Sequence, residues 1–347
     1  MPANPKIVVR FNFPYSPAMA ERFAREADIE LRTCNANAPE AEVWPHLSAA
    51  HVFMVSSAKD ELPRQWFVTA DLLARCPKLI CVSMSGAGYD TVDVDACTKA
   101  GVIVVNQAGI NAKSVAEHTL GLMLAISKRI GECDRRLRRE RGFPREALMG
   151  HEIGEHTVGL VGIGHVGTRV AHLAAAFGMR VLAYDPYLDA EEIARRGAQS
   201  VSFDDLLAQS DFVSIHCPRT KETQGMLNAA AFARMKKGAI FITTARGGIH
   251  DEAALFEALK SGRLAGAGVD VWDKEPPPLD HPLLTLDTVI ATYHTAGVTH
   301  EARHGVAGQG ADQVVGVLKG GRPPRLVNPE AWPAYRARFE EIIGVTV

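Results

Sequence analysis

Three charged or titratable side chains in the second half of the chain follow apolar runs that predict β-strands. They are Arg246, Glu275 and His294. A guanidinium is a planar fork that binds a carboxylate through two hydrogen bonds. An imidazole can donate a proton to a reacting oxygen or accept one from it, and a carboxylate bonded to that imidazole fixes its tautomer and stabilises the imidazolium. The set could bind an organic acid and move a proton beside it.

Each of these residues taken alone also has an ordinary explanation. Arg246 could be a surface cation, Glu275 an acid in a proline-rich loop, and His294 one of the thirteen histidines. Because function must be argued from a whole site, the interpretation depends on what binds beside them.

A glycine-rich turn between a predicted strand and a predicted helix indicates a dinucleotide site. The apolar run Thr157–Val161 is followed by Gly162-Ile163-Gly164-His165-Val166-Gly167, which has the spacing G-x-G-x-x-G. In this motif the first glycine allows a tight turn, the second lets the backbone approach a pyrophosphate, and the third lets helix and strand pack closely. The N–H groups at the start of the helix attract the diphosphate.

A second predicted strand, Arg180–Tyr184, ends in Asp185, where an acid that binds the ribose 2′-OH is expected. No arginine follows within residues 186–188 to neutralise a 2′-phosphate, which favours NAD over NADP. With a nicotinamide as hydride carrier, Arg246, Glu275 and His294 suffice to interconvert a 2-hydroxy acid and a 2-oxo acid.

The first hundred residues predict a separate α/β layer with a parallel sheet, because strands alternate with helical stretches. The predicted strands are Lys6–Phe11, His51–Val55, Leu79–Ser83 and Gly101–Val105. The loop Ser85–Gly88 could bind a small anion such as a carboxylate with exposed N–H groups, or could be a plain glycine-rich turn. The proline-punctuated segment 322–343 is expected to pack back on this layer.

A long helix is predicted to begin near Asn111. Ser114 and Glu117 have the spacing of a capping box. Residues Val115–Ile130 are apolar nearly all round, which is typical of a helix buried between domains or subunits. The basic run Arg135–Arg141 is best explained as a solvated helix face and not as a nucleic-acid site.

Length and composition narrow the class of protein. The chain has 347 residues, 47% of them hydrophobic and 22% charged, with a formal net charge of −2. This balance of charge favours neither nucleic acid nor an anionic membrane as partner. The sequence contains no run of about 18 uncharged apolar residues, the length needed to span a membrane. The N-terminus lacks the apolar region of a signal peptide. Six scattered cysteines without a C-x-x-C pair indicate the reduced thiols of a cytoplasmic protein and no metal site.

From about His51 to Asn328 the chain resembles the D-isomer-specific 2-hydroxyacid dehydrogenase family. The motifs that carry the resemblance are, in order, SGAGYDTVD, NAKSVAEHTLGLML, GLVGIGHVG, VLAYDP, TTARGG, GAGVDVWDKEP and HTAG. The resemblance implies an α/β fold of two doubly wound parallel-sheet domains. A Rossmann NAD-binding domain, residues 107–295, would be inserted into a flavodoxin-like substrate domain made of residues 1–106 and 296–347.

The resemblance also implies roles for the matching residues. Arg246 would bind the substrate carboxylate and carbonyl, and His294 would be the acid and base with Glu275 as its partner. Ala87 and Gly88 would hold the carboxylate with backbone N–H groups. Asp270 would contact the nicotinamide amide of NAD, and His165 and Val166 the diphosphate. The other positions implied around the cofactor are Gly162, Gly164, Gly167, Asp185, Cys217, Thr223, Thr244, Ala245, Arg246, His294 and Gly297.

Some positions depart from the family pattern. Thr243 stands where the family often has asparagine, and Tyr293 where it usually has proline before the histidine. Glu275 makes formate an unexpected substrate, because formate dehydrogenases of the family carry glutamine there. The short stretch after Asn328 leads us to expect no regulatory domain of the kind found on many phosphoglycerate dehydrogenases.

Two alternatives remain open at this stage. The same three residues could serve a phosphite-type dehydrogenase, and an NAD(H)-sensing, corepressor-like protein of the family would keep them as well. The sequence names neither the 2-hydroxy acid nor the physiological direction. The family's habit leads us to expect a homodimer, with the helix Val115–Ile130 near the interface.

Overall fold

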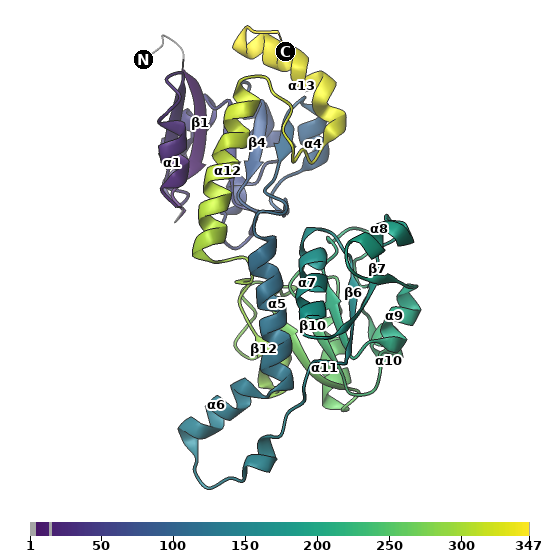
Figure 1. Ribbon diagram of the computed structural model, residues 1–347. Helices are drawn as coiled ribbons and strands as arrows, with labels where there is room; N and C mark the ends of the chain where they lie inside the picture. Colours follow the sequence, from purple (N-terminus) through teal and green to yellow (C-terminus); the bar gives the residue numbers. More distant parts are fainter. Residues whose placement is uncertain (1–4, 14–15, 347) are drawn as a thin grey trace. The chain divides into compact units, whose positions relative to one another are not determined.

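The computed structural model describes residues 5–13 and 16–346, so the predicted strands all lie inside it, and residues 1–4, 14–15 and 347 lie outside. The chain forms two compact units, which we describe one at a time (Figure 1). The first unit comprises Met1–Asn111 and Thr299–Val347, and the second comprises Ala112–Val298. The second unit is therefore an insertion in the first.

The first unit is built on a five-stranded parallel sheet in the order β2-β1-β3-β4-β5. Its strands are β1 (Lys6–Phe11), β2 (Ile29–Cys34), β3 (Val52–Val55), β4 (Cys81–Met84) and β5 (Ile103–Val105). Its helices are α1 (Ala18–Phe23), α2 (Glu40–Leu47), α3 (Ala70–Arg75), α4 (Val94–Lys99), α12 (His300–Leu318) and α13 (Trp332–Ile343).

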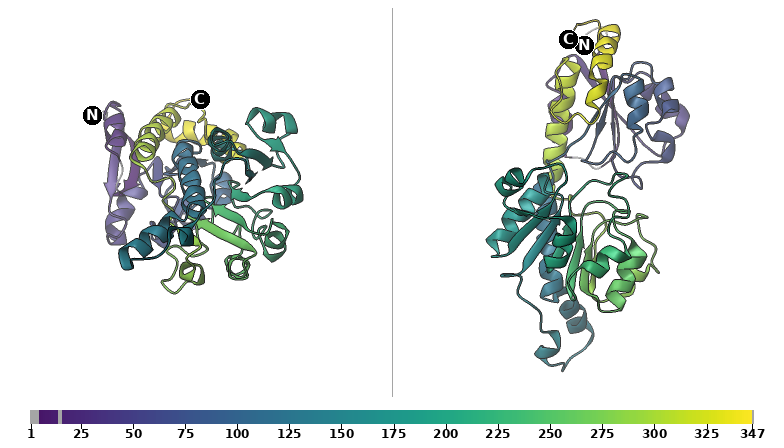
Figure 2. Two further views of the ribbon diagram at one scale, coloured as in Figure 1. Left: turned by 60° about the horizontal axis from the view of Figure 1, so that its bottom comes forward. Right: turned by 90° about the vertical axis from the view of Figure 1, so that its right-hand side faces the viewer.

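Helices cover both faces of this sheet, which is why β3 and β4 are buried throughout and apolar except at Ser83. Side chains of α2, α3 and α4 pack on one face, and those of α1, α12 and α13 pack on the other. Figure 2 shows α12 and α13, in yellow-green and yellow, beside the sheet formed by the N-terminal strands. The segment 322–343 packs back on the first unit, as predicted.

The second unit is built on a seven-stranded parallel sheet in the order β12-β11-β10-β9-β6-β7-β8. Its strands are β6 (Thr157–Val161), β7 (Arg180–Tyr184), β8 (Gln199–Ser200), β9 (Phe212–Ile215), β10 (Ala239–Thr243), β11 (Leu264–Val269) and β12 (Val289–Ala291). Its helices are α5 (Ala112–Ser127), α6 (Ile130–Arg139), α7 (His165–Ala176), α8 (Ala190–Arg195), α9 (Phe203–Gln209), α10 (Ala229–Arg234) and α11 (Glu252–Lys260).

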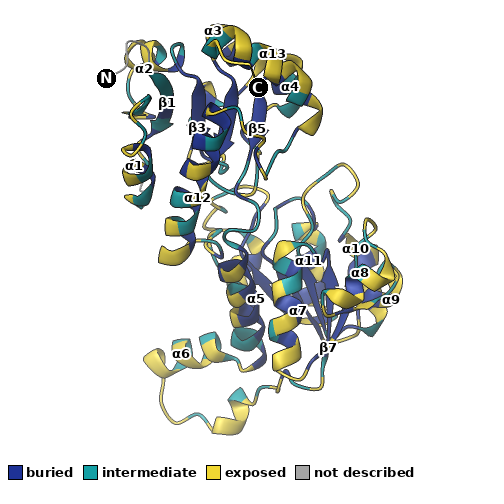
Figure 3. Cartoon of the chain, turned by 45° about the horizontal axis from the view of Figure 1, so that its top comes forward, coloured by how far each residue is buried: buried dark blue, intermediate teal, exposed yellow. Residues whose placement is uncertain are grey.

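This sheet is also covered on both faces, with its buried strands dark blue in Figure 3. Side chains of α5 and α7 form one apolar cluster with the strands, and those of α9, α10 and α11 form the other. The strand order reverses at β6, which lies between β9 and β7. In open α/β sheets ligands bind beyond the carboxyl ends of the strands at such a switch point.

The helix after Asn111 differs from the prediction in two ways. The capping box was wrong, because α5 begins at Ala112 and Ser114 lies inside it, where its hydroxyl donates to the carbonyl of Ala296 at 2.7 Å. The helix ends at Ser127, and Arg129, with a left-handed φ of 52°, separates it from α6. Arg135, Arg136 and Arg138 of α6 are exposed or half-buried and pair with carboxylates, as is typical of a solvated face.

Within the described residues, no helix has the length and apolar character needed to cross a membrane. The same part of the chain contains no group of three His, Cys, Asp or Glu side chains placed to hold a metal ion. All six cysteines are free thiols, and four of them are buried.

His51 makes the stability of the first unit depend on pH. Its Nδ1 accepts a hydrogen bond from the N–H of Ile7 at 2.8 Å. Burial, helped by the charges of Lys78 and Lys6, lowers its pKa from 6.5 to about 4. As the pH falls, His51 is therefore protonated in the unfolded chain before it is protonated in the folded chain. The contribution of His51 to the free energy of unfolding is fully present above pH 6.5, and it decreases by about 1.4 kcal/mol per pH unit as the pH falls towards 4.

We predict that His51→Asn, whose Oδ1 can still accept from Ile7, loses less stability between pH 6.5 and 4 than the native chain. Urea unfolding followed by fluorescence at several pH values measures this. An identical pH dependence in both proteins would contradict the assignment.

Candidate active site

The predicted site residues of the second unit lie at one edge of its sheet, because each follows the carboxyl end of a parallel strand. The strands and the residues that follow them are β6 with Gly162–Gly167, β7 with Asp185, β9 with Cys217 and Thr223, β10 with Thr244–Arg246, β11 with Asp270 and Glu275, and β12 with His294 and Gly297. Ala87 and Gly88 belong to the first unit, where they follow β4.

The three glycines of the G-x-G-x-x-G turn have different surroundings. Gly162 has a φ of 89°, and a Cβ there would lie 2.8 Å from the backbone nitrogen of Cys217. A Cβ on Gly167 would overlap the carbonyl oxygen of Gly162. A Cβ on Gly164 would meet nothing within 4 Å. Gly164 also immediately precedes α7, so open space lies beside the N-terminus of that helix.

Asp185 lies directly beside this turn. One carboxylate oxygen accepts from the N–H of Ile163 at 3.1 Å, and the other accepts from the N–H of Tyr187 at 3.2 Å. These bonds hold the carboxylate at the end of β7, next to the glycine-rich turn on β6.

Two further predicted cofactor positions have their side chains tied to the protein. Thr223 Oγ1 donates to the carbonyl of Pro218 at 2.7 Å, and Thr244 Oγ1 lies 3.2 Å from Thr119 Oγ1 in the interior. Burial raises the pKa of the Cys217 thiol to about 11, so this side chain is uncharged at neutral pH.

The carboxylate of Asp270 is fully buried and organises the loop after β12. Oδ1 accepts from the hydroxyl of Thr292 at 2.6 Å and from the N–H of Thr295 at 2.8 Å, and Oδ2 accepts from the N–H of Ala296 at 3.1 Å. The Asp270 carbonyl accepts from the N–H of His294 at 2.7 Å. Asp270 therefore holds this loop on both sides of His294.

His294 and Glu275 form the pair that the sequence predicted as neighbours. His294 Nδ1 lies 2.9 Å from Glu275 Oε2, while Glu275 Oε1 accepts from the N–H of Trp272 at 3.1 Å. His294 has a left-handed φ of 47°, which is uncommon outside glycine. Nε2 has no hydrogen-bond partner in the described part of the chain. With Glu275 accepting at Nδ1, Nε2 is the nitrogen available for proton transfer.

Arg246 lies on the loop next to that of Glu275, since β10 and β11 are neighbours in the sheet. Its Nη1 donates to the carbonyl of Ala245 at 2.7 Å. A Cβ on Gly247 would overlap the carbonyl of Trp272, and the N–H of Gly248 donates to Asp273 at 2.6 Å. This close packing fixes the Arg246 loop against the loop that carries Glu275.

Sequence reasoning missed that α5 also holds the loop that carries His294. His118 Nε2 lies 3.1 Å from Thr292 Oγ1, one helical turn beyond the bond from Ser114 to Ala296. Ser114 and His118, two polar residues four positions apart and so on one side of a mainly apolar helix, were the available signal.

Comparisons with known proteins place the chain in a family. Residues 120–296 match the model of the D-isomer specific 2-hydroxyacid dehydrogenase, NAD binding domain. The chain is 44% identical over 253 residues to a D-3-phosphoglycerate dehydrogenase of Archaeoglobus fulgidus, covering 73% of this chain and 48% of that protein. The chain thus spans about half the length of the phosphoglycerate dehydrogenases it matches first.

Two other similar proteins are matched over most of their length. A glyoxylate reductase of Korarchaeum cryptofilum is 38% identical over 266 residues, which cover 76% of this chain and 80% of that one. The crystal structure of a D-lactate dehydrogenase from Aquifex aeolicus, complexed with NAD and lactic acid, has a TM-score of 0.76 at 29% identity, covering 90% of this chain and 96% of that one. The chain belongs to the D-isomer specific 2-hydroxyacid dehydrogenase family, and its second unit carries the family's NAD binding domain.

Proposed function

We propose that the protein is an NAD-dependent D-2-hydroxyacid dehydrogenase, which transfers a hydride between NAD(H) and a 2-hydroxy or 2-oxo acid. The observation that carries this proposal is the 2.9 Å contact between His294 Nδ1 and Glu275 Oε2, at the edge of a sheet that matches the NAD binding domain. The relatives named as D-3-phosphoglycerate dehydrogenase and glyoxylate reductase support an acid of this class as substrate.

The residues of the second unit fit NAD. The space beside Gly164 lets a pyrophosphate approach the backbone at the start of α7, where unpaired N–H groups and the helix dipole attract it. Asp185 accepts hydrogen bonds from a ribose and repels a 2′-phosphate. NADH, when bound, would supply the hydride that C2 of the 2-oxo acid accepts. His165 and Val166 contact the diphosphate in this proposal.

His294 and Arg246 carry out the remaining steps. In reduction the imidazolium of His294 would give its Nε2 proton to the oxygen on C2. Glu275 accepts from Nδ1–H throughout, which stabilises the imidazolium and orients the ring. Arg246 binds the substrate carboxylate with its planar fork. In oxidation the neutral imidazole takes the proton back.

Ala87 and Gly88, in the first unit, bind the carboxylate with their backbone N–H groups in this proposal. Tyr293, which precedes His294, has a half-exposed side chain.

We predict that the native protein reduces 2-oxo acids with NADH, and uses NADPH less efficiently. His294→Ala should lower kcat by about 10²–10⁴-fold, because general acid catalysis contributes that much, while NADH still binds. Arg246→Ala should raise KM as well. His281→Gln is a matched control, since His281 also contacts a carboxylate, that of Glu252 at 3.1 Å. NADH absorbance with glyoxylate, pyruvate, hydroxypyruvate and larger 2-oxo acids measures all four proteins.

Near-normal turnover by His294→Ala would contradict its role. Tight NADH binding without turnover of any 2-oxo acid would favour the NAD(H)-sensing alternative, and reduction of NAD by phosphite would favour the phosphite-type alternative.

Gly164 and Gly167 allow a separate test of the cofactor site. Gly164→Ala adds a methyl group to open space, so the free energy of unfolding in urea should change little while NADH binds more weakly. Gly167→Ala forces a Cβ against the Gly162 carbonyl and should destabilise the unit by about 1–3 kcal/mol. Normal NADH affinity in fluorescence titrations of Gly164→Ala would show that the diphosphate binds elsewhere.

We also propose a homodimer that pairs through α6 and the residues up to Met149. The apolar character of α5 is accounted for by packing inside the second unit, since its buried side chains share a cluster with α7. Three large apolar side chains remain exposed on the neighbouring segment, namely Ile130, Leu137 and Met149. In Figure 1 this segment extends away from the other elements of its unit.

Light scattering should therefore give a dimer at micromolar concentration, and Leu137→Asp should shift it towards the monomer. Leu279→Asp, at a fully exposed loop position, is the control that should stay dimeric. A native monomer, or equal effects of the two variants, would contradict this interface.

A further inference from the structure

The loop Ser85–Gly88 is attached to the strand ends on either side of β4. On the β3 side, the N–H of Ser85 donates to the carbonyl of Val55 at 2.9 Å, and a Cβ on Gly86 would lie 2.6 Å from Ser57 Oγ. The backbone of the loop is therefore pressed against the segment after β3.

On the β5 side, two successive carbonyls of the loop are held by two successive residues. The N–H of Gln107 donates to the carbonyl of Gly86 at 2.9 Å, and Nδ2 of Asn106 donates to the carbonyl of Ala87 at 2.8 Å. Both carbonyls consequently point towards the end of β5.

These two bonds fix the direction of the N–H groups that the proposed function assigns to the substrate. The carbonyl of Gly86 and the N–H of Ala87 share one trans peptide plane, as do the carbonyl of Ala87 and the N–H of Gly88. Each N–H therefore points away from Asn106 and Gln107. Neither N–H has an acceptor among the described residues. Two adjacent backbone N–H groups that point outward together form an anion-binding concavity.

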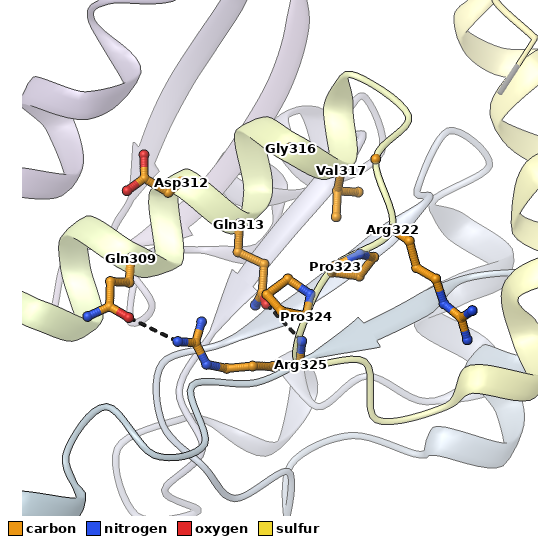
Figure 4. Close-up of a pocket in the computed structure, with 10 residues that line it drawn as sticks. Gln309, Asp312, Gln313, Gly316, Val317, Arg322, Pro323, Pro324 and Arg325 are labelled. Atoms are coloured by element: carbon orange, nitrogen blue, oxygen red, sulfur yellow. Dashed lines mark hydrogen bonds between the residues drawn. The ribbon is translucent and has the colours of Figure 1, made fainter.

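Asn106 is itself held firmly. Its Oδ1 accepts from the N–H of Ala108 at 3.2 Å, which leaves Nδ2 directed at Ala87. Its carbonyl accepts from Gln313 Nε2 at 3.1 Å, and its N–H donates to the carbonyl of Arg325 at 3.2 Å. Gln313 Oε1 in turn accepts from the N–H of Arg325 (Figure 4). A chain of hydrogen bonds from α12 thus reaches the loop through Asn106.

We propose that Asn106 is a positioning residue for substrate binding, which aims the N–H of Gly88 at the substrate carboxylate by holding the carbonyl of Ala87. This inference rests on the proposed function, in which that loop binds the carboxylate. The N–H of Ala87 is aimed in the same way by the backbone of Gln107, which no side-chain substitution removes. Asn106 is thus the side chain through which the geometry of the anion site can be changed.

Two substitutions separate this role from other functions of Asn106. Asn106→Asp keeps the acceptor for Ala108 but removes the donor to Ala87 and adds a negative charge. Asn106→Leu removes both the donor and the acceptor and adds no charge. Each variant should raise KM for the best 2-oxo acid and Ki for oxamate about tenfold, in line with weakening a hydrogen bond to a charged group. The NADH dissociation constant should stay within twofold of the native value.

Each outcome decides a specific point. If Ki rises in Asn106→Leu but not in Asn106→Asp, Asn106 acts through its bond to the N–H of Ala108. If Ki rises in Asn106→Asp but not in Asn106→Leu, the added negative charge is the cause. Either result would overturn the proposal. Unchanged KM and Ki in both variants would overturn it as well. A native protein that turns over no 2-oxo acid would instead refute the proposed function, so the two failures are distinguishable. A weakened NADH affinity would also overturn the proposal, because it would show that the effect of Asn106 is not confined to the anion-binding loop.

Discussion

The buried carboxylate of Asp270 is the interaction on which the geometry of the candidate active site depends. A charge with no exposed surface is tolerated only when hydrogen bonds surround it, and here the partners come from one loop, Thr292–Ala296. The same loop is held from α5 by Ser114 and His118. His294 keeps its uncommon left-handed backbone because the residues around it are fixed on both sides.

The parallel sheet of the second unit places the loop Thr292–Ala296 at the same edge as the loops that carry the other candidate site residues. Neighbouring strands β10, β11 and β12 end side by side, so Arg246, Glu275 and His294 lie on loops at the same edge of the sheet although 48 positions separate the first from the last. Glu275 then needs only the short loop after β11 to reach His294 Nδ1. The opposite side of β10 leads to β9 and β6, where the glycine-rich turn stands. The glycine-rich turn and His294 therefore lie along the same edge of one sheet.

Much of this could be predicted from the sequence, because the relevant signals are local. The strands β1, β6 and β7 have the predicted bounds, and the three glycines of the turn have surroundings that suit the roles expected of them. The pairing of His294 with Glu275 came from the family resemblance and not from spacing.

The features that sequence reasoning missed depend on tertiary contacts. β2 is an edge strand whose residues are mostly half-buried, so it lacks the continuous apolar pattern of the inner strands. Ser114 and Glu117 have capping-box spacing, yet the serine bonds to a loop 182 positions away. The bond from Asn106 to Ala87 likewise joins the ends of two neighbouring strands, which no local pattern indicates.

The central claim is that a hydride reaches C2 of a 2-oxo acid while His294 protonates the oxygen. Reduction of pyruvate or glyoxylate with NADH carrying deuterium at the transferred C4 position tests this directly by NMR of the product. The account predicts deuterium bonded to C2 and, from pyruvate, the D isomer of the hydroxy acid. Product without deuterium at C2, or with the L configuration, would contradict it.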